Sequence, residues 1–332
     1  MKNTPLKFVV LLLFLWNVAG VQAQTKIIFD TDIGGDADDL GALVMLHNFI
    51  ESGDCDLLAI MNWGTDKYAV PAIDAVNRFY LHPNIPIGTR KDKLTTSDLQ
   101  YNKVIADNFE YKLTYNDVPD ATQLYRKILA ASEDTSVTIV AVGPLLNIKR
   151  LIESQPDSNS PLNGLELISK KVNEFVIMGG HFPKGKNEWN FNGNMPGITK
   201  FVIEHLETPI VFSGFELGEQ IKTGEVFNEI DKNTPLYQGF LYYSGHAPWI
   251  KAKFNGAILP NSSFDQTAVL YAVIGGVGTY WEKIEGGKCV VEENGDNHWA
   301  KREKSNHAYL KLIESPKKMA QIIDAIMLNR FK

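Results

Sequence analysis

The chain has 332 residues, of which 44% are hydrophobic, and its formal net charge is −6. This charge and the lack of a long basic run in the sequence argue against nucleic acid or an anionic membrane surface as the partner. The two cysteines, Cys55 and Cys289, are too few for a disulfide framework. The sequence is compatible either with one bridge between them or with two buried thiols.

The first residues have the three-part pattern of a secretory signal peptide. Lys2 and Lys7 make the start of the chain basic, and the apolar run Phe8–Trp16 follows. Val21-Gln22-Ala23 then places small residues ahead of a cleavage site before Gln24. The apolar run is too short to span a bilayer, and no cysteine follows it to carry a lipid. We therefore expect residues 1–23 to be a signal peptide and residues 24–332 to be exported, periplasmic or secreted, without a membrane anchor.

The mature chain alternates short apolar runs with stretches of helical periodicity. The predicted strands are Lys26–Phe29, Leu57–Met61, Ile85–Ile87, Val137–Val142, Glu174–Met178 and Pro209–Phe212. The predicted helices are Leu40–Ile50, Tyr68–Tyr80, Ala121–Ser132, Leu145–Glu153 and Ile198–Leu206. Near-continuous Val, Ile and Leu strands between amphipathic helices indicate an α/β layered fold with a mostly parallel sheet, covered by helices on both faces.

The rest of the pattern predicts one domain with a small C-terminal elaboration. Residues 155–164 are expected to form a loop, a local insertion too short to be a domain linker. From Glu282 the pattern changes, because Lys288–Glu292 and His307–Leu312 resemble short strands and Lys317–Asn329 resembles a closing helix. No internal repeat, heptad array or low-complexity tract interrupts the sequence, which favours a single domain.

Five aspartates lie between the first predicted strand and the first predicted helix: Asp30, Asp32, Asp36, Asp38 and Asp39. In a parallel sheet this is the carboxyl edge, where ligands bind. Five carboxylates so close together repel one another unless a cation or protons compensate. Oxygen donors without His or Cys suit calcium or magnesium rather than zinc. The glycine pair after Ile33 permits the turn that gathers them, so the loop predicts a metal site.

Two other interpretations explain part of this loop. Aspartate favours the first turn of a helix through capping and the helix dipole, which accounts for one or two of the five. Dehalogenase-type phosphatases also carry Asp-x-Asp after the first strand, but they have Thr two residues after the second Asp, where this chain has Gly34. The metal site is therefore the favoured hypothesis.

The acidic loop is the first of five segments that occur in a specific order between Lys26 and Tyr271. The loop supplies Asp30-Thr31-Asp32-Ile33-Gly34 and Asp38-Asp39; Val142-Gly143-Pro144-Leu145-Leu146-Asn147, Met178-Gly179-Gly180, Glu188-Trp189-Asn190-Phe191 and Phe264-Asp265-Gln266-Thr267-Ala268-Val269 follow. Together they resemble the inosine–uridine-preferring nucleoside hydrolase family. Its corresponding motifs are Asp-x-Asp-x-Gly with Asp-Asp, Gly-Pro-Leu-Thr-Asn, Met-Gly-Gly, Glu-Phe-Asn and His-Asp-x-x-Ala-Val.

The resemblance implies a calcium-dependent catalytic domain over residues 24–332. The implied Ca²⁺ ligands are Asp32, Asp39, Asp265 and the main-chain carbonyl of Leu146; Asp38 is the implied base, Glu188 and Asn190 hold ribose hydroxyls, and Met178 lies near the sugar. Asp30 is expected to support the metal ligands without binding the metal itself. Asp36, in a loop longer than the family's, has no assigned role. The family is commonly dimeric or tetrameric, which implies a homo-oligomer.

The chemistry suits these residue types. Cleavage of an N-glycosidic bond passes through an oxocarbenium-like ribosyl cation, which anionic surroundings stabilise. A bound divalent ion lowers the pKa of its water, and a neighbouring carboxylate takes the water's proton. We therefore expect hydrolysis of ribonucleosides or of a related N-ribosyl compound. Trp189 and Phe191 suit either a wall beside the sugar or core packing.

Two departures from the family pattern affect the leaving-group side of the pocket. Phe264 stands where the family often has a His that protonates the leaving purine, and residues 63–66 stand where it places a ribose-binding Asn. Phe264 is suited to stack on a base. By loop position, His181 and His246 are the candidate acids that remain.

Two function classes therefore stay open. The first is a ribosyl hydrolase, which the complete set of four aspartates Asp32, Asp38, Asp39 and Asp265 favours, since a binding protein has no need of a base. The second is a calcium-dependent sugar-binding or carbohydrate-processing protein with altered or lost chemistry, and Phe264 is the feature that favours it. In both classes the partner is a small nucleoside or ribosyl compound.

Overall fold

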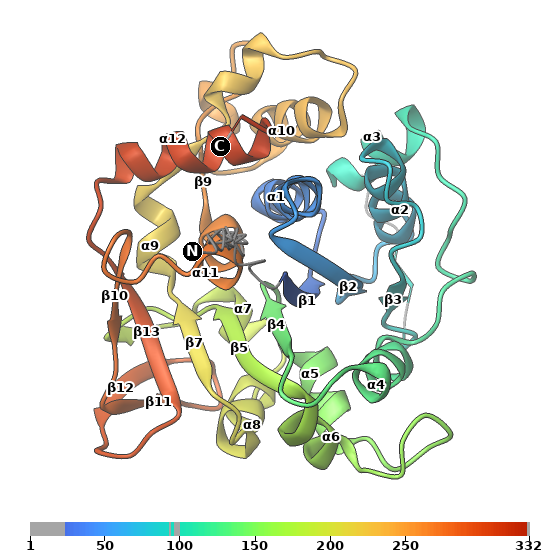
Figure 1. The fold of residues 1–332 in the computed structure, drawn as a ribbon. Coiled ribbons are helices and arrows are strands. Elements are labelled where there is room, and N and C mark those ends of the chain that lie inside the picture. Colours follow the sequence, from blue (N-terminus) through green and yellow to red (C-terminus); the bar gives the residue numbers. More distant parts are fainter. Residues whose placement is uncertain (1–23, 93, 96–99, 331–332) are drawn as a thin grey trace, which may run out of the picture.

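The computed structural model describes residues 24–92, 94–95 and 100–330 (Figure 1). The predicted signal peptide, residues 1–23, lies outside the described residues. Within the described ranges, no helix combines the length and the hydropathy that crossing a bilayer requires.

A large sheet forms the centre of the domain (Figure 1). In the described part of the chain it has eight strands in the order β10-β13-β7-β5-β4-β1-β2-β3, and only β10 runs antiparallel to its neighbour. The strands are β1 (Thr25–Thr31), β2 (Cys55–Asn62), β3 (Ile87–Thr89), β4 (Val137–Ala141), β5 (Val172–Met178), β7 (Ile210–Ser213), β10 (Trp281–Ile284) and β13 (His307–Leu312). The mostly parallel α/β fold predicted from the sequence is confirmed.

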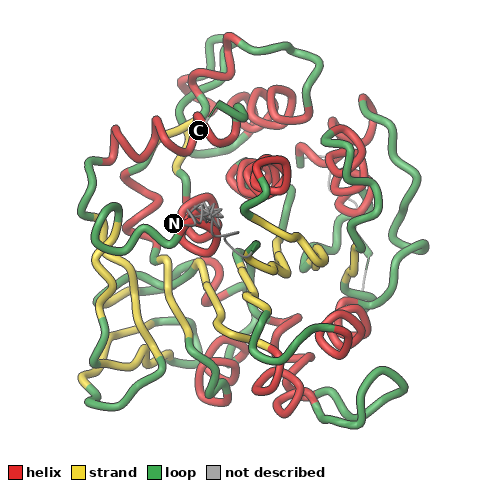
Figure 2. The backbone as a smooth tube through the Cα atoms, in the orientation of Figure 1, coloured by secondary structure: helices red, strands yellow, loops and turns green. Residues whose placement is uncertain are grey.

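Helices cover both faces of this sheet, and Figure 2 shows them on either side of the strands. One hydrophobic cluster joins the sheet to α1 (Asp38–Ser52), α2 (Ala69–Phe79), α3 (Tyr101–Asn108), α9 (Phe215–Gln220), α10 (Pro235–His246), α11 (Phe264–Ile274) and α12 (Pro316–Met327). The other joins it to α4 (Ala121–Ala131), α5 (Leu146–Glu153), α6 (Gly164–Lys171), α7 (Trp189–Asn192) and α8 (Ile198–His205).

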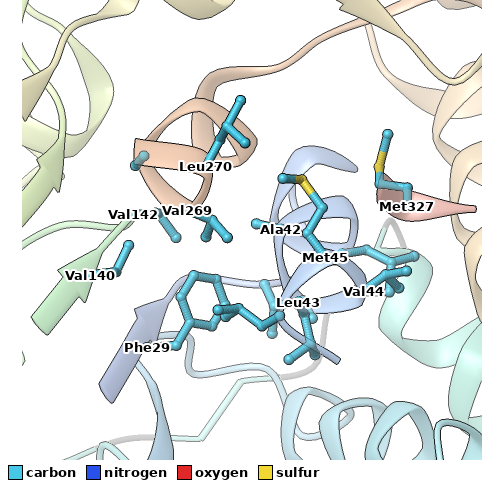
Figure 3. Packing of buried hydrophobic residues seen from close by; sticks show 14 of the residues in the cluster. Phe29, Ala42, Leu43, Val44, Met45, Val140, Val142, Val269, Leu270 and Met327 are labelled. Atoms are coloured by element: carbon cyan, nitrogen blue, oxygen red, sulfur yellow. The ribbon is translucent and has the colours of Figure 1, made fainter. Parts of the chain in front are cut away.

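Helix α1 is buried along most of its length, and this fixes the position of its first turn. In Figure 3, Leu43 of α1 packs near Phe29 of β1, and Val269 of α11 lies beside them. A helix that is apolar on all sides belongs in a core. Because α1 is held between the sheet, α11 and α12, the aspartates at its start have a fixed place relative to the strand ends.

The C-terminal region differs from the sequence prediction. Strands β10 and β13 extend the central sheet, so this region is only partly a separate elaboration. Of the described strands, β6 (Lys184–Gly185), β11 (Gly287–Val291) and β12 (Asn297–Lys301) form a second sheet, and β8 (Lys222–Thr223) pairs with β9 (Asn261–Ser262). Short 3₁₀ turns cover Glu225–Glu229 and Lys251–Lys253.

Three smaller expectations can also be compared with the structure. The third strand begins at Ile87 rather than at Ile85, after Pro86, which has no N–H to give to a ladder. The segment before α6 is a loop, as predicted. Cys55 and Cys289 are both buried free thiols, so the single-bridge alternative is wrong.

Candidate functional site

The segments singled out in the sequence converge at the carboxyl edge of the central sheet. Strands β1, β4 and β5 are neighbours in the sheet and run parallel, so the segments that follow them start side by side. Helix α11, which carries Asp265, packs against α1 and begins at the same end. Residues separated by more than two hundred positions therefore meet at one place.

Three carboxylates form the centre of this site. Asp38, Asp39 and Asp265 are buried, and one oxygen of each lies within 4.8 Å of one oxygen of the others. The main-chain N–H of Asp265 donates to Asp38 Oδ2 at 3.3 Å, and the hydroxyl of Thr31 donates to Asp39. The N-cap residue of α1 is Ala37, which has no side-chain capping bond. Asp38 and Asp39 therefore do not cap α1, although both lie in its first turn, where the helix dipole favours acidic residues.

Asp32, in the loop after β1, is not in this group of three, but its charge helps to raise the pKa values of Asp39 and Asp265. Its Oδ2 accepts a hydrogen bond from the indole nitrogen of Trp189 at 3.0 Å. On its other side is Gly143, where a Cβ atom would stand 2.9 Å from Asp32 Oδ1. Only glycine permits so close an approach, so the turn after β4 packs directly on the acidic loop. This turn leads to Leu146, the first residue of α5.

Electrostatics sets these carboxylates apart from ordinary surface aspartates. Burial, followed by the charges of the neighbouring carboxylates, raises the pKa values of Asp38, Asp39 and Asp265 well above the usual range. Burial raises the pKa of Asp32 to about 6. Among the described residues, no Lys, Arg or His forms an ion pair with any of the four. Buried carboxylate oxygens without a cationic partner fit a hard divalent cation such as Ca²⁺.

The one-turn helix α7 borders the site. Glu188 caps it by accepting main-chain N–H bonds from Gly180 at 2.8 Å and from Asn190 and Phe191 at 3.1 Å each. Burial raises the pKa of Glu188 to about 7. The amide of Asn190 donates to the main-chain oxygen of Val142 at 2.8 Å, and to that of Met178 at 3.2 Å. These bonds tie α7 to the ends of β4 and β5.

Comparison with known proteins identifies the family of the chain. The model of the inosine-uridine preferring nucleoside hydrolases matches residues 27–332. The chain belongs to this family. No curated protein matches it.

Solved structures agree with the family assignment at the level of the fold. The chain is similar to an inosine-guanosine nucleoside hydrolase, with a TM-score of 0.65, 17% identity, and coverage of 92% of this chain and 98% of the other. It is also similar to the inosine-uridine preferring nucleoside hydrolase of Bacillus anthracis, with a TM-score of 0.63, 14% identity, and coverage of 92% of this chain and 99% of the other. A third similar structure is that of the type III effector protein XopQ complexed with adenosine diphosphate ribose. Its TM-score is 0.62 at 13% identity, and the match covers 94% of each chain.

A row of three aromatic rings begins at Phe264, the first residue of α11. Phe264 stacks on Phe215 with centroids 4.8 Å apart, and Phe215 stacks on His181 at 5.9 Å. Asn297 bonds the main chain of His181 on both sides, at 3.1 and 3.0 Å. His246, in contrast, is exposed at the end of α10 and stacks on the preceding turn. Only His181 of the two candidates therefore lies in line with Phe264.

The two aspartates left over in the loop have clear partners. Asp30 accepts hydrogen bonds from the hydroxyl of Tyr125 at 2.8 Å and from the amide of Asn147 at 3.1 Å, and burial raises its pKa to about 7. Asp36, for which the sequence suggested no role, accepts from Asn261 at 2.8 Å and also bonds Tyr243. Asp36 thus fastens the lengthened loop to the segments around α10 and β9.

Other residues that shape the site were missed in the sequence. Tyr101 and Asn102 at the start of α3 bind the loop main chain, through Gly34 N–H at 3.0 Å and the Ile33 carbonyl at 2.8 Å. In the second-strand turn, the Arg90 guanidinium lies 4.8 Å from the Trp63 ring centre. These contacts join residues that are far apart in the sequence, so no local sequence pattern predicts them.

Proposed function

We propose that this chain is a calcium-dependent hydrolase of the N-glycosidic bond of ribonucleosides or of a related N-ribosyl compound. The buried cluster of Asp38, Asp39 and Asp265, without a basic partner among the described residues, is the main support for this function. The proposed ligands are Asp32, Asp39, Asp265 and the carbonyl of Leu146. These residues would hold a divalent cation, which would supply activation of the attacking water and help to orient ribose hydroxyls.

The protein's own groups supply the remaining chemistry. Asp38 is the proposed base that takes the proton of the attacking water, because its buried carboxyl group lies next to the proposed ligands Asp39 and Asp265. The negative charge of the site favours the oxocarbenium-like ribosyl cation as the bond breaks. Glu188 and Asn190 are the proposed partners of the ribose hydroxyls, and the Asn190 amide lies 3.1 Å from the sulfur of Met178 at the end of β5.

His181 is the proposed proton donor to the leaving base. The water oxygen bonds to the anomeric carbon, the carbon–nitrogen bond breaks with its electron pair going to the base, and His181 protonates a base nitrogen. Phe264 is the proposed stacking partner of the base, since aromatic rings stack on one another.

A sugar-binding or carbohydrate-processing role with altered chemistry is the second candidate. It is supported by Phe264 in the place of the family's acid, and by the resemblance to an effector protein complexed with adenosine diphosphate ribose. On this alternative the acidic cluster holds calcium and a ribosyl group without cleaving it.

A panel of purine and pyrimidine nucleosides distinguishes the two. With Ca²⁺ present, we expect the purified protein to release ribose, measured as reducing sugar, from at least one nucleoside, and Asp38→Ala to abolish this release. Calcium binding by wild type and Asp38→Ala is measured in parallel. If the whole panel yields no ribose while calcium still binds, hydrolysis of nucleosides is ruled out and the second candidate gains.

A further inference from the structure

Trp189 has a hydrogen-bond donor where the family's Glu-Phe-Asn motif has none. Its indole N–H lies 3.0 Å from Asp32 Oδ2, whereas a phenylalanine in this place offers no donor. We propose that Trp189 is a positioning residue for the metal site, and that its indole fixes the orientation of the Asp32 carboxylate. This inference rests on the proposed role of Asp32 as a ligand.

Packing does not explain the tryptophan. The side chain of Trp189 is 51% exposed, so it gains only part of the stabilisation that a buried indole brings. Its position comes instead from its neighbours, because Glu188 and Asn190 anchor α7 to the ends of β4 and β5. The indole is therefore held beside Asp32 by a turn that is itself hydrogen-bonded to the ends of the strands. Its N–H is the group that makes a specific contact.

Asp32 is confined from two sides. Gly143 packs against its Oδ1 and Cβ, and Trp189 binds its Oδ2. A carboxylate held in this way does not have to be ordered when the cation arrives. Hydrogen bonds to metal ligands from outside the ligand set commonly change metal affinity by about 10- to 100-fold.

Calcium affinity of the full-length mature protein, stripped of metal and titrated by isothermal calorimetry, tests this role without any need for turnover. We expect Trp189→Phe to weaken calcium binding by about 10-fold, at the lower end of that range. Trp189→Gln places an amide N–H the same number of bonds from the Cα atom, and we expect it to recover part of the affinity. Trp299→Phe is the matched control, because Trp299 packs on Phe182 and Tyr309 at the second sheet.

Thermal unfolding in chelator shows whether each variant is folded. Equal calcium affinity in wild type and Trp189→Phe would overturn the proposal, and so would an equal loss in the Phe and Gln variants. If wild type binds no calcium, the metal assignment and this inference both fail. A protein that binds calcium with the expected order of variants but cleaves no nucleoside supports the inference and contradicts only the proposed hydrolysis.

Discussion

The partners of a carboxylate decide how it behaves in this protein. Asp92, near the end of β3, accepts hydrogen bonds from Arg90 and Arg150, and the first of these holds its pKa well below the usual range. Asp39 has the opposite shift because it is buried beside other carboxylates. The chain thus has guanidinium groups available close to the sheet edge, yet none pairs with the described acidic cluster. Such a cluster is stable when a cation supplies the missing charge.

His181 can be tested at the residue scale by changing the leaving group. A nucleoside base needs a proton to depart, whereas p-nitrophenolate leaves readily as an anion. We expect His181→Ala to lower kcat for the best nucleoside by about 100-fold, within the range of general acid catalysis, and to change hydrolysis of p-nitrophenyl riboside little.

His246→Ala is the matched control for this test, since His246 is exposed and stacked on Tyr242. We expect it to leave both rates unchanged. An equal loss of rate on both substrates in His181→Ala would mean that the histidine supports the structure of the ring row and donates no proton.

At the scale of elements, α12 carries a buried carboxyl group that links stability to pH. Asp324 accepts the main-chain N–H of Gly224 at 2.9 Å, and burial raises its pKa to about 6. The folded chain therefore holds this proton more tightly than the unfolded chain, whose Asp pKa is about 4. The contribution of Asp324 to the free energy of unfolding consequently falls as pH rises from about 4 to about 6, and is constant above that.

Asp324→Asn removes this titration but keeps an oxygen for Gly224. We expect the free energy of unfolding of the variant, relative to wild type, to rise between pH 4 and 6 and then to level off. Urea unfolding of both proteins across this range measures the difference. A difference that does not vary with pH would show that burial does not shift Asp324.

The loop before α6 depends on one buried arginine of α4. Arg126 contacts both oxygens of Asp157, at 3.0 and 3.1 Å, and the carbonyl oxygens of Ser160 and Leu162 at 3.1 and 2.9 Å. We expect Arg126→Met to lower the free energy of unfolding by about 2 kcal/mol, typical of hydrogen bonds to a charged group, as measured in urea. Lys127→Met, on the exposed side of α4, should change it by less than about 0.5 kcal/mol. Similar effects of both substitutions would contradict the anchoring role.

For the molecule as a whole, the sequence predicted what short segments encode. Strands β1, β2, β4, β5 and β7 each contain a short apolar run, and the motif segments lie directly after β1, β4 and β5, so the carboxyl edge could be located in advance. Helix α10 could not be predicted from the sequence, because Gly239, Gly245 and several aromatic residues give it a weak intrinsic helix propensity. It forms because it packs on α3 and α1: a Cβ at Gly239 would stand 2.3 Å from Leu40. Tyr243 of α10 then reaches Asp36 through this packing alone.

The acidic cluster joins α1 to α11, which are far apart in the sequence. Calcium bound there should therefore change the free energy of unfolding of the whole chain. Asp38 and Asp39 belong to α1 and Asp265 to α11, so their repulsion opposes the packing of these two helices when no cation is bound. We expect Asp265→Asn to raise the free energy of unfolding in chelator at neutral pH, since it removes a carboxyl group whose pKa is raised by burial and by its neighbours and which therefore opposes folding at this pH.

In calcium the order of the two proteins should reverse. A ligand that binds only the folded chain stabilises it by about 2.7 kcal/mol at 100 times its Kd. Wild type should gain this stabilisation, while Asp265→Asn, with one ligand oxygen fewer and a smaller negative charge, should gain far less. Urea unfolding with chelator and with excess calcium measures both effects. If the variant gained as much as wild type, Asp265 would not be a ligand. If it were less stable than wild type even in chelator, Asp265 would have a structural role, and repulsion within the cluster would not be what calcium relieves.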